Sequence, residues 1–432
     1  MIVLGIDLGT QSAKAIAWDG RVVGEGAAPI ETRRPAADRA EQDPRVWETA
    51  IGAAVAACGV RDVGAIAVTG QLDGCVGVDA NGAPLGPCLI WQDRRAAAGA
   101  AVLDERTGQI ADPSHLGPKA AWLAANGMRA AVWHQPTSYV VARLTGEHVI
   151  DHALASTTMR YDLAARAWID PAQLPRLAHA SDVAGTLTAD GAALLGLRAG
   201  IPVVVGTGDD FATALGADLT SEVAITLGTA EVVGARSDHL VLDRDALVET
   251  HAFPTGGYFV ENPGWLAGGA LRWIESITGG APPADDADGL VFIPALAGAM
   301  SPVWRPTARG TFHGLTPRHT GRHLVRAVLE GCAFACRDVV DRLRALGLPC
   351  PSAIALGGGT RVPAWVPIHA AALGIPVATL GGPDATIYGA IKLAVPDAPP
   401  LPRAQRFAPG PSLDENYARY RALVAALAPL WS

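Results

Sequence analysis

The chain has 432 residues, a formal charge of −8 and a hydrophobic fraction of 50%. This length and composition suggest two or three globular domains with large buried cores. The negative charge, without any block of like charges, argues against a nucleic-acid surface or an anionic membrane as a partner.

No secretion signal is expected, because the N-terminus begins with Met1-Ile2-Val3-Leu4 and shows neither a basic region nor a cleavage site. The longest apolar stretch, residues 290–300, is too short to span a membrane and contains Pro294. The six cysteines form no Cys-x-x-Cys pair and are expected to be small buried residues in a reducing cytoplasm. A metal site on Cys332 and Cys336 is not expected, since no histidine cluster accompanies them.

The first strand, residues 2–6, leads into Asp7 and then into the polar Gly9-Thr10-Gln11-Ser12, before a second strand at 13–18. This pattern predicts a hairpin with a glycine-opened tip. Such a tip suits phosphate, because Gly9 lets backbone N–H groups come close and the hydroxyls add donors. Asp7 could hold a magnesium ion that balances the phosphate charge. An ordinary hairpin in which Asp7 caps the turn explains this stretch alone equally well.

Two further strands of the first half end in polar residues. After a helix that starts at Asp43-Pro44, the strand 63–68 ends in Gly70-Gln71-Leu72-Asp73-Gly74, where a plain turn is the better explanation taken alone. The strand beginning at Cys88 ends in Trp91-Gln92-Asp93-Arg94-Arg95. Its acid and guanidinium groups can fix a polyhydroxylated ligand or pair with each other, and both alternatives stay open.

The strand 201–205 runs into Gly206-Thr207-Gly208-Asp209-Asp210 and a small-residue helix, 211–217. The glycines allow a substrate close to the backbone, and Asp209 would project near a helix N-terminus. A carboxylate in that position can accept the proton of an attacking hydroxyl, which is the acid/base chemistry that alcohol phosphorylation needs. Helix capping by the two aspartates explains the segment better when it is taken alone.

The second half repeats the first hairpin, because residues 224–233 again give strand, Leu-Gly-Thr and strand. Helices are expected from Gly268-Gly269 onward and over 323–346, where apolar residues recur at three- and four-residue spacing. The strand 353–356 is followed by Gly357-Gly358-Gly359, which implies flat backbone pressed against a ligand such as a purine and ribose. Pro363-Ala364-Trp365 are expected to open a helix, and residues 399–411 form a proline-rich connection to a last helix.

The internal duplication predicts two similar lobes, each offering one Gly-Thr hairpin to the phosphates of a shared nucleotide. At the level of this pair of motifs, the arrangement resembles the actin-like ATPase fold.

The motifs taken together resemble the FGGY family of carbohydrate kinases, with coverage from residue 2 to about residue 392. The two blocks 308–320 and 326–331 are most similar to xylulokinases. The motifs that carry the resemblance are Asp7-x-Gly9-Thr10, Gly70-Gln71-Leu72-Asp73-Gly74, Trp91-Gln92-Asp93-x-Arg95, Gly206-Thr207-Gly208-Asp209, Leu227-Gly228-Thr229 and Gly357-Gly358-Gly359.

The resemblance implies an α/β protein of two ribonuclease-H-like domains with an interdomain active-site cleft, which we place at 1–219 (sugar and first phosphate loop) and 220–432 (nucleotide). It implies transfer of the γ-phosphoryl group of ATP, with Mg²⁺, to a sugar or polyol hydroxyl. Asp209 falls on the catalytic base and Asp7 on the acid near magnesium. The substrate residues are expected to be Gln71, Leu72, Asp73, Trp91, Asp93 and Asp209; the phosphate and nucleotide residues are expected to be Gly9, Thr10, Gln11, Gly228, Thr229, Gly269, Gly357, Gly358 and Gly359.

Three departures from the family pattern bear on specificity. Asp73 stands where xylulokinases usually have histidine, which favours a neutral ligand over a carboxylate such as gluconate by like-charge repulsion. Ala230 and Glu231 stand where the second phosphate loop usually has serine and glycine, so Glu231 must point away, bind through metal or weaken the use of ATP. The segment 296–300 lacks the usual Glu-Arg after Gly298.

We therefore expect a cytoplasmic kinase of a neutral, xylulose-like ketopentose, with a small-molecule partner and neither nucleic acid nor membrane; a homodimer is compatible with this. A glycerol or other polyol kinase is the alternative within the family, since 91–95 also resembles glycerol kinases. From other classes, an actin-like ATPase without an acceptor and a non-catalytic sugar-binding protein remain open. For the last, Ala230 and Glu231 are the only indications.

Overall fold

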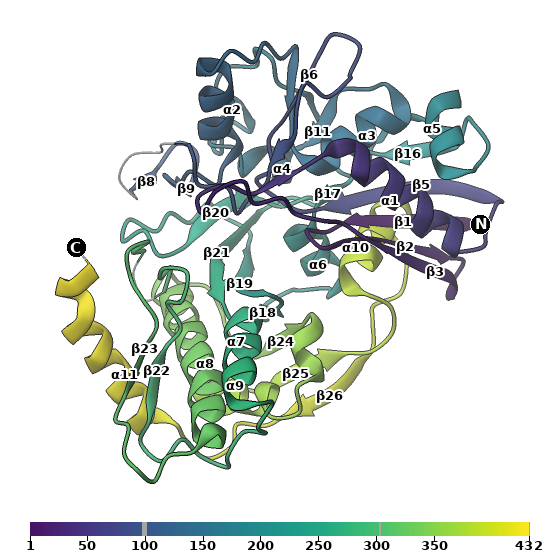
Figure 1. Ribbon diagram of the computed structural model, residues 1–432. Coiled ribbons are helices and arrows are strands. Elements are labelled where there is room, and N and C mark those ends of the chain that lie inside the picture. The colour runs from purple at the N-terminus through teal and green to yellow at the C-terminus, as the bar shows by residue number, and fades with distance from the viewer. Residues whose placement is uncertain (97–101, 302–303, 432) are drawn as a thin grey trace. The chain divides into compact units, whose positions relative to one another are not determined.

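The computed structural model describes residues 1–96, 102–301 and 304–431, and the chain divides into two compact units (Figure 1). Unit 1 comprises Met1–Asp218, His251–Tyr258 and Pro383–Leu401, and unit 2 comprises Leu219–Thr250, Phe259–Gly382 and Pro402–Ser432. These units differ from the predicted domains in two segments, because 251–258 and 383–401 pack within unit 1.

Unit 1 is built on a sheet in which β1 and β5 are parallel neighbours and β1, β2 and β3 form an antiparallel run. The order is β15-β16-β5-β1-β2-β3, and β17 also pairs with β5. The strands are β1 (Ile2–Leu8), β2 (Ser12–Trp18), β3 (Val22–Pro29), β5 (Val63–Gly70), β15 (Val183–Thr186), β16 (Pro202–Val204) and β17 (Thr207–Gly208).

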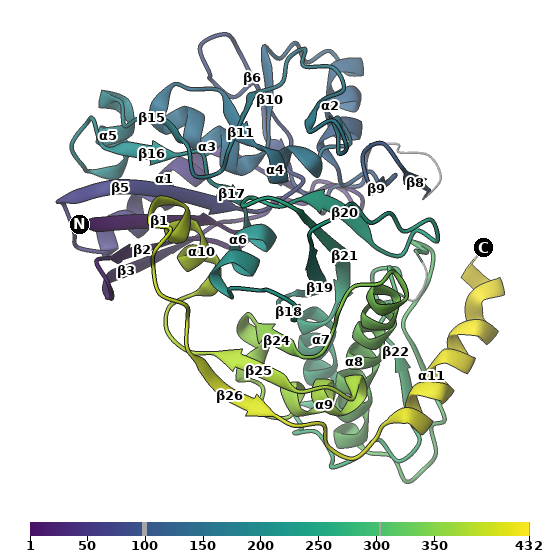
Figure 2. The same ribbon diagram turned by 180° about the vertical axis from the view of Figure 1, so that it is seen from behind.

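Helices cover both faces of this sheet (Figures 1 and 2). One face packs against α1 (Pro44–Ala57), α3 (Pro136–Thr145) and α5 (Ala189–Leu195), and the other against α6 (Asp209–Gly216) and α10 (Ala385–Ala394). The predicted start of α1 is confirmed, because Asp43 accepts a hydrogen bond from the Arg45 N–H as the N-cap and Pro44 follows it.

Short elements make up much of the rest of unit 1, with β4 before α1 and the others between β5 and β15, and they include a small core with Leu116, Leu123 and Trp133. They are β4 (Glu41–Gln42), β6 (Val76–Val78), β7 (Cys88–Leu89), β8 (Leu103–Asp104), β9 (Gln109–Ile110), α2 (Leu116–Ala125), β10 (Val132–His134), β11 (Val149–Asp151), α4 (His152–Ser156), β12 (Tyr161–Asp162), β13 (Ala167–Trp168) and β14 (Arg176–Ala178).

Unit 2 repeats the pairing pattern of unit 1, since β18 is antiparallel to β19 and parallel to β24. The sheet order is β20-β21-β19-β18-β24-β25-β26. The strands are β18 (Val223–Leu227), β19 (Ala230–Ser237), β20 (Glu249–Ala252), β21 (Tyr258–Leu266), β24 (Ala353–Leu356), β25 (Val377–Leu380) and β26 (Arg403–Phe407). The predicted internal duplication is therefore present in the sheet topology of the two units.

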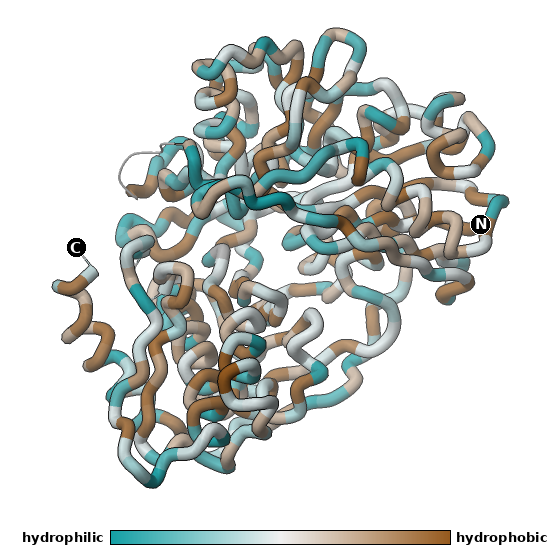
Figure 3. Tube along the Cα trace, in the orientation of Figure 1, coloured by the Kyte–Doolittle hydropathy of each residue, from teal (hydrophilic) through white to brown (hydrophobic). Residues whose placement is uncertain are grey.

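The helices of unit 2 pack on this sheet and on one another. The central one is α8 (Gly321–Ala345), which is buried along most of its length, and Figure 3 shows hydrophobic segments along the chain inside each unit. The remaining elements are α7 (Gly268–Thr278), β22 (Val291–Ile293), β23 (Thr311–His313), the 3₁₀ helix η1 (Gly358–Arg361), α9 (Trp365–Leu373), α11 (Asp414–Leu427) and the 3₁₀ helix η2 (Ala428–Trp431). Among the described helices, none combines the length and the apolar character that crossing a membrane requires.

Three expectations about local structure were wrong. The triple glycine is not flat: Gly357 has a φ of +80°, and η1 begins at the next residue. The proline-rich segment 399–411 contains β26, which pairs with β25. The strand that begins at Cys88 ends at Leu89, because Trp91 and the residues after it form turns around buried side chains.

The contact between α6 and α10 places the backbones of two helices unusually close together. A Cβ atom on Gly389 would overlap the carbonyl oxygen of Ala212, and one on Gly216 would overlap the carbonyl oxygen of Ala385. Only glycine allows this approach. Because α6 starts at Asp209, the contact also fixes the position of that residue.

We predict that Gly389→Ala destabilises unit 1, because the new methyl group forces α10 away from α6. Overpacking of this kind lowers the free energy of unfolding by about 1–3 kcal/mol. Thermal unfolding should show a lower midpoint, and turnover should fall as the start of α6 shifts. The matched control is Gly410→Ala, where the nearest atom to the new Cβ is Ala371 Cβ at 3.8 Å. Equal midpoints for the two variants would contradict the prediction.

Candidate active site

The tip of the β1–β2 hairpin is held by side chains from three other segments. Gln42 Nε2 donates to the Thr10 carbonyl at 2.7 Å, and Trp91 Nε1 donates to Thr10 Oγ1 at 3.0 Å. Thr10 Oγ1 in turn donates to Gln71 Oε1 at 3.3 Å, and the Gln71 N–H donates to the Leu8 carbonyl at 2.9 Å. The predicted residues Thr10, Gln71 and Trp91 are thus brought together in one network.

Carboxylates gather beside this tip. Asp7 is buried, and its Oδ1 is a buried oxygen without a hydrogen-bond partner in the described structure. Burial raises the pKa of Asp7 to about 7, with a further increase from Asp384 that Lys14 opposes. Lys14 lies opposite Asp7 on β2, and its Nζ is 2.9 Å from Asp384 Oδ2. Sequence analysis missed Lys14 and Asp384, because their positions follow from strand register and from the packing of α10.

Asp209 is the first residue of α6, and its neighbours shift its proton affinity. Burial raises the pKa of Asp209 well above the usual range, and the charges of Asp210 and Asp7 raise it further. The alternative of helix capping is not supported, since Gly208 is the N-cap and α6 has no side-chain cap hydrogen bond. Asp209 therefore lies close enough to Asp7 to be affected by its charge, and both are buried carboxyl groups with raised pKa values.

Asp73 sits in a turn that a buried lysine organises. Its backbone has a φ of +60°, and its carbonyl accepts a hydrogen bond from Lys119 Nζ at 2.6 Å. Lys119 Nζ also donates to the carbonyls of Ile90 and Ser114, and burial lowers the pKa of this fully buried amine to about 8. Sequence analysis missed Lys119, because a lysine in a helix is ordinarily a surface residue.

The Asp73 carboxylate lies near two further polar side chains. Its Oδ1 is 3.2 Å from His115 Nδ1, which is also 3.1 Å from Gln109 Nε2. Burial raises the pKa of Asp210 to about 6, and the charge of Asp73 contributes to this shift. Leu72 packs on the backbone of Gly208, where a Cβ atom would overlap the leucine side chain. Leu72 and Asp73 are thus brought to the start of α6, beside Asp209 and Asp210.

Asp93 was expected to contact the substrate, but its position in the structure does not agree with this. Its side chain is completely buried, and its Oδ2 accepts a hydrogen bond from the Ala40 N–H at 2.8 Å. Both oxygens also accept from Arg95, whose Nη2 lies 2.7 Å from Glu41 Oε1. The carboxylate therefore supports the loop that carries Trp91, and the surface pairing considered for Arg95 is a buried network.

In unit 2, glycines converge on the tip of the β18–β19 hairpin. The N–H of Gly269, in the first turn of α7, donates to the Thr229 carbonyl at 3.0 Å, and the Gly268 N–H donates to the Gly228 carbonyl at 3.2 Å. Gly357 approaches the same hairpin, because a Cβ atom there would lie 2.8 Å from the Leu227 carbonyl oxygen. A glycine-rich turn beside a helix N-terminus offers backbone N–H groups to a phosphate.

Of the two remaining glycines of the predicted nucleotide set, Gly359 packs against Leu227 and Trp365, and only Gly358 borders open space. Gly358 is exposed, and a Cβ atom on it would meet nothing within 4 Å. Arg272 Nη2 donates to Thr229 Oγ1 at 3.2 Å, which places a positive charge at the second hairpin. Sequence analysis did not assign a role to Arg272; its position one turn into α7 was the available signal.

Glu231 points away from this turn. Its side chain is completely buried, and His369 Nε2 is 2.7 Å from Glu231 Oε1. Burial on its own would lower the pKa of His369, but the charge of Glu231 and the hydrogen bond outweigh it and raise the pKa above its usual value. Of the three explanations offered for Glu231, the structure supports the first, in which the carboxylate does not face phosphate.

Two groups of residues could in principle hold a metal ion. Glu231, Cys336 and His369 place their donor atoms within 4.8 Å of one another, but all three are buried and the acid and the imidazole are already hydrogen-bonded. Asp7 fits a hard cation better, since its orphaned Oδ1 is an oxygen donor beside other carboxylates. All six cysteines are buried and free, as expected.

Comparison with known proteins settles the family. The model of the FGGY family of carbohydrate kinases matches residues 2–216 with its N-terminal domain and residues 223–397 with its C-terminal domain. The chain belongs to this family. It is therefore a carbohydrate kinase, a phosphotransferase that uses ATP, and its two-domain α/β structure is consistent with the actin-like ATPase fold.

Relatives of this kinase include xylulose kinases and glycerol kinases. A xylulose kinase of Escherichia coli (strain K12) is 32% identical over 84% of this chain and 83% of its own length. A glycerol kinase of Gloeobacter violaceus is 31% identical over 90% of this chain and 86% of its own length. The crystal structure of a xyloylose kinase from Brucella ovis superposes with a TM-score of 0.90 at 30% identity, covering 100% of both chains.

We predict that the Glu231–His369 pair of this kinase makes its stability depend on pH. Because the pKa of folded His369 is raised above the unfolded value of about 6.5, the stabilisation is complete below that pH and is lost as the pH rises through the folded pKa. The thermal midpoint should accordingly fall as the pH is raised from 6.5 through the folded pKa of His369. Glu231→Ala should remove this dependence of the thermal midpoint on pH and lower the free energy of unfolding by about 3–5 kcal/mol.

The control for this experiment is Glu415→Ala, which breaks the exposed ion pair between Glu415 and Arg419. Exposed pairs contribute at most about 1 kcal/mol. The role given to His369 would be contradicted if the wild-type midpoint did not change with pH. It would also be contradicted if the wild-type midpoint rose with pH together with that of the control.

Proposed function

We propose that this kinase transfers the γ-phosphoryl group of ATP to a hydroxyl of a neutral, xylulose-like ketopentose, with Asp209 as the general base. The observation that carries the proposal is the group of mutually repelling carboxylates at the start of α6 and the end of β1 in unit 1. A carboxylate whose pKa is raised above the usual aspartate range is a stronger base than an ordinary aspartate, so it can take a hydroxyl proton as attack develops.

We assign the acceptor and the first phosphate-binding turn to unit 1, and the nucleotide to unit 2. In unit 1, Gln71 and Trp91 hold Thr10 and so keep the backbone N–H groups of the Gly9-Thr10-Gln11 tip in place. In unit 2, the turn at Gly228 and Thr229 lies against the N-terminus of α7. Preorganised N–H donors of this kind stabilise the charge of a transferring phosphoryl group.

Magnesium fits this scheme at Asp7. The ion, when bound, would neutralise phosphate charge, and the orphaned Asp7 Oδ1 would supply a ligand to it. Lys14 and Asp384 hold each other as an ion pair beside Asp7, so Asp384 is not left as a second unpaired carboxylate.

The neutrality of the substrate follows from charges already present. Asp73, Asp209 and Asp210 lie near one another, as the raised pKa values of the last two show. A substrate that carries a carboxylate would add another negative charge to this group, whereas hydroxyl groups can donate hydrogen bonds to it. Asp73 also contacts the buried His115, whose other ring nitrogen, Nε2, lies 3.1 Å from the Ile110 carbonyl oxygen.

A glycerol or other polyol kinase is the second candidate. It is favoured by the glycerol kinase relative, which matches as much of the chain as the xylulose kinase relative does. Trp91 also belongs to the segment that resembles glycerol kinases, and its indole is part of the network around Thr10.

Replacing Asp209 with Asn should lower kcat by about a hundred-fold or more, the usual scale for loss of a general base. In the wild type, kcat/KM should fall on the acidic side at a pH above the ordinary aspartate range, because the base must be ionised and its pKa is raised. Both kcat and the pH dependence of kcat/KM are measured by coupled ADP detection over a range of pH values. The control is Asp190→Asn, an exposed acid in α5. Near-normal turnover in the Asp209→Asn variant would remove Asp209 from its role.

A substrate panel should show that neutral ketopentoses and polyols turn over and gluconate does not. Asp73→Asn should reduce the difference in kcat/KM between the neutral substrates and gluconate, because it removes one repelling charge while keeping a side chain of similar shape. The measurement is kcat/KM for D-xylulose, glycerol, other polyols and gluconate with both proteins. Gluconate as the best substrate of the wild type would reject the charge argument, and glycerol as the best would favour the second candidate.

A further inference from the structure

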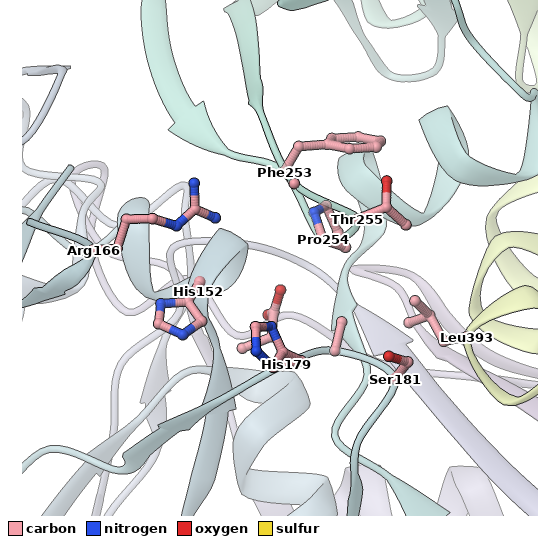
Figure 4. A pocket seen from close by; sticks show the side chains of 11 residues that line it. His152, Arg166, His179, Ser181, Phe253, Pro254, Thr255 and Leu393 are labelled. Carbon is pink, nitrogen blue, oxygen red and sulfur yellow. The ribbon is translucent and has the colours of Figure 1, made fainter. Parts of the chain in front are cut away.

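A cavity in unit 1 is lined by residues that have no role in the proposed reaction. It has a volume of about 430 Å³, which is within the range of about 300–1,000 Å³ for small-molecule sites. All of its lining residues belong to unit 1, including the turn 253–256 and Leu393 of α10. Figure 4 shows its labelled side chains, with Arg166 and His152 on one side and Phe253, Pro254 and Leu393 on the other.

Three nitrogen-bearing side chains meet in this cavity. They are Arg166 from the β12–β13 turn, His152 from the first position of α4, and His179 just after β14. The rings of His152 and His179 have centroids 5.7 Å apart. Burial lowers the pKa of His152, and the positive charges of Arg166 and His179 lower it further. These groups therefore lie close enough to repel one another when they are charged.

The acids around the cavity do not pair with these cations. Among the described residues, no carboxylate forms an ion pair with Arg166, His152 or His179; the guanidinium of Arg166 instead lies over the Tyr258 ring, 6.0 Å from its centroid. Asp182 acts on His152 only through its charge, which partly offsets the repulsion. The cavity is therefore electropositive on its Arg166 side.

Asp151 lines the cavity but its oxygens are already engaged. Oδ1 accepts a hydrogen bond from the Leu154 N–H at 3.1 Å, and Oδ2 accepts from the Ala153 N–H at 3.1 Å and from Thr207 Oγ1 at 3.0 Å. Burial raises the pKa of Asp151 to about 7, so its charge is reduced near neutral pH. It therefore offers little repulsion to an anion.

The rest of the wall suits an organic molecule. Ser181 and Thr255 provide hydroxyl groups, and Phe253, Pro254 and Leu393 provide apolar surface. An arginine fork can bind a phosphate with two parallel hydrogen bonds, and imidazoles can donate further ones. We propose that this cavity binds a small phosphomonoester, such as a phosphorylated polyol, with its phosphate on Arg166, His152 and His179.

This site is separate from the residues assigned to catalysis, but one contact links the two. Thr207 donates to Asp151 at the cavity and stands two residues before Asp209 in β17 and α6. An anion beside Asp151 would favour its protonated form and so weaken its acceptance of the Thr207 hydroxyl. A bound phosphomonoester is thus placed to affect the position of Asp209.

The test is isothermal titration calorimetry on the full chain without ATP or sugar. Glycerol 3-phosphate is the probe; glycerol, inorganic phosphate and acetate are titrated separately. Wild-type protein should bind glycerol 3-phosphate, and Arg166→Ala should weaken this binding at least tenfold. The matched control Arg176→Ala removes an exposed arginine of β14 that does not line the cavity, and it should bind as the wild type does.

Several results would overturn the proposal. These are no binding of glycerol 3-phosphate to the wild type, equal weakening by Arg166→Ala and Arg176→Ala, and acetate binding as tightly as glycerol 3-phosphate. Inorganic phosphate binding as tightly as glycerol 3-phosphate would assign the site to free phosphate and remove the organic ligand. If Arg166→Ala does not fold, His179→Gln at an exposed position replaces it and should also weaken binding.

The difference between the wild type and Arg166→Ala decides the outcome, because glycerol 3-phosphate would also bind at the active site as a product if the kinase acted on glycerol. Basal turnover of Arg166→Ala should equal that of the wild type, because Arg166 lies outside the proposed catalytic residues. Loss of glycerol 3-phosphate binding with unchanged turnover would support the second site even if D-xylulose proved not to be a substrate. Loss of turnover with unchanged binding would instead place Arg166 in the reaction and overturn the proposal.

Discussion

The close approach of α6 and α10 is the constraint on which the acceptor site of unit 1 depends. Gly216 and Gly389 let the two helix backbones meet where any side chain would overlap a carbonyl oxygen. The start of α6 is thereby fixed against the sheet, with Asp209 close enough to Asp7 for the charge of Asp7 to add to the effect of burial and Asp210 and raise the pKa of Asp209. A packing contact between two glycines thus sets the proton affinity of the proposed base.

This arrangement also explains why the unit contains a segment from late in the chain. Residues 383–401 return to unit 1 because α10 supplies the second layer of its sheet, through Ala390 and Leu393 on one side and Gly389 toward α6. Asp384, at the N-terminus of α10, then pairs with Lys14 beside Asp7. The helix α10 therefore contributes both to the hydrophobic core of unit 1 and to the charge environment of Asp7.

Local signals predicted the elements well, and long-range contacts account for what was missed. Both hairpins, the start of α1 and the helix after Asp209 follow from glycine positions, capping and apolar spacing, all of which act over a few residues. The burial of Asp93 with Arg95 and the place of Lys119 among three carbonyls depend on segments far apart in the chain. β26 was missed because its exposed, polar sequence becomes a strand only by pairing with β25.

Glu231 departs from the family pattern, but its side chain does not change the charge at the neighbouring Gly228-Thr229 turn. Period-two alternation on β19 turns Glu231 to the side of the strand opposite Ala230, and α9 supplies His369 to meet it inside the core. The carboxylate is therefore compensated by a buried partner and adds no negative charge beside Thr229. The Glu231 side chain does not face the turn that we propose to bind phosphate, and the sequence difference alone does not argue for a non-catalytic protein.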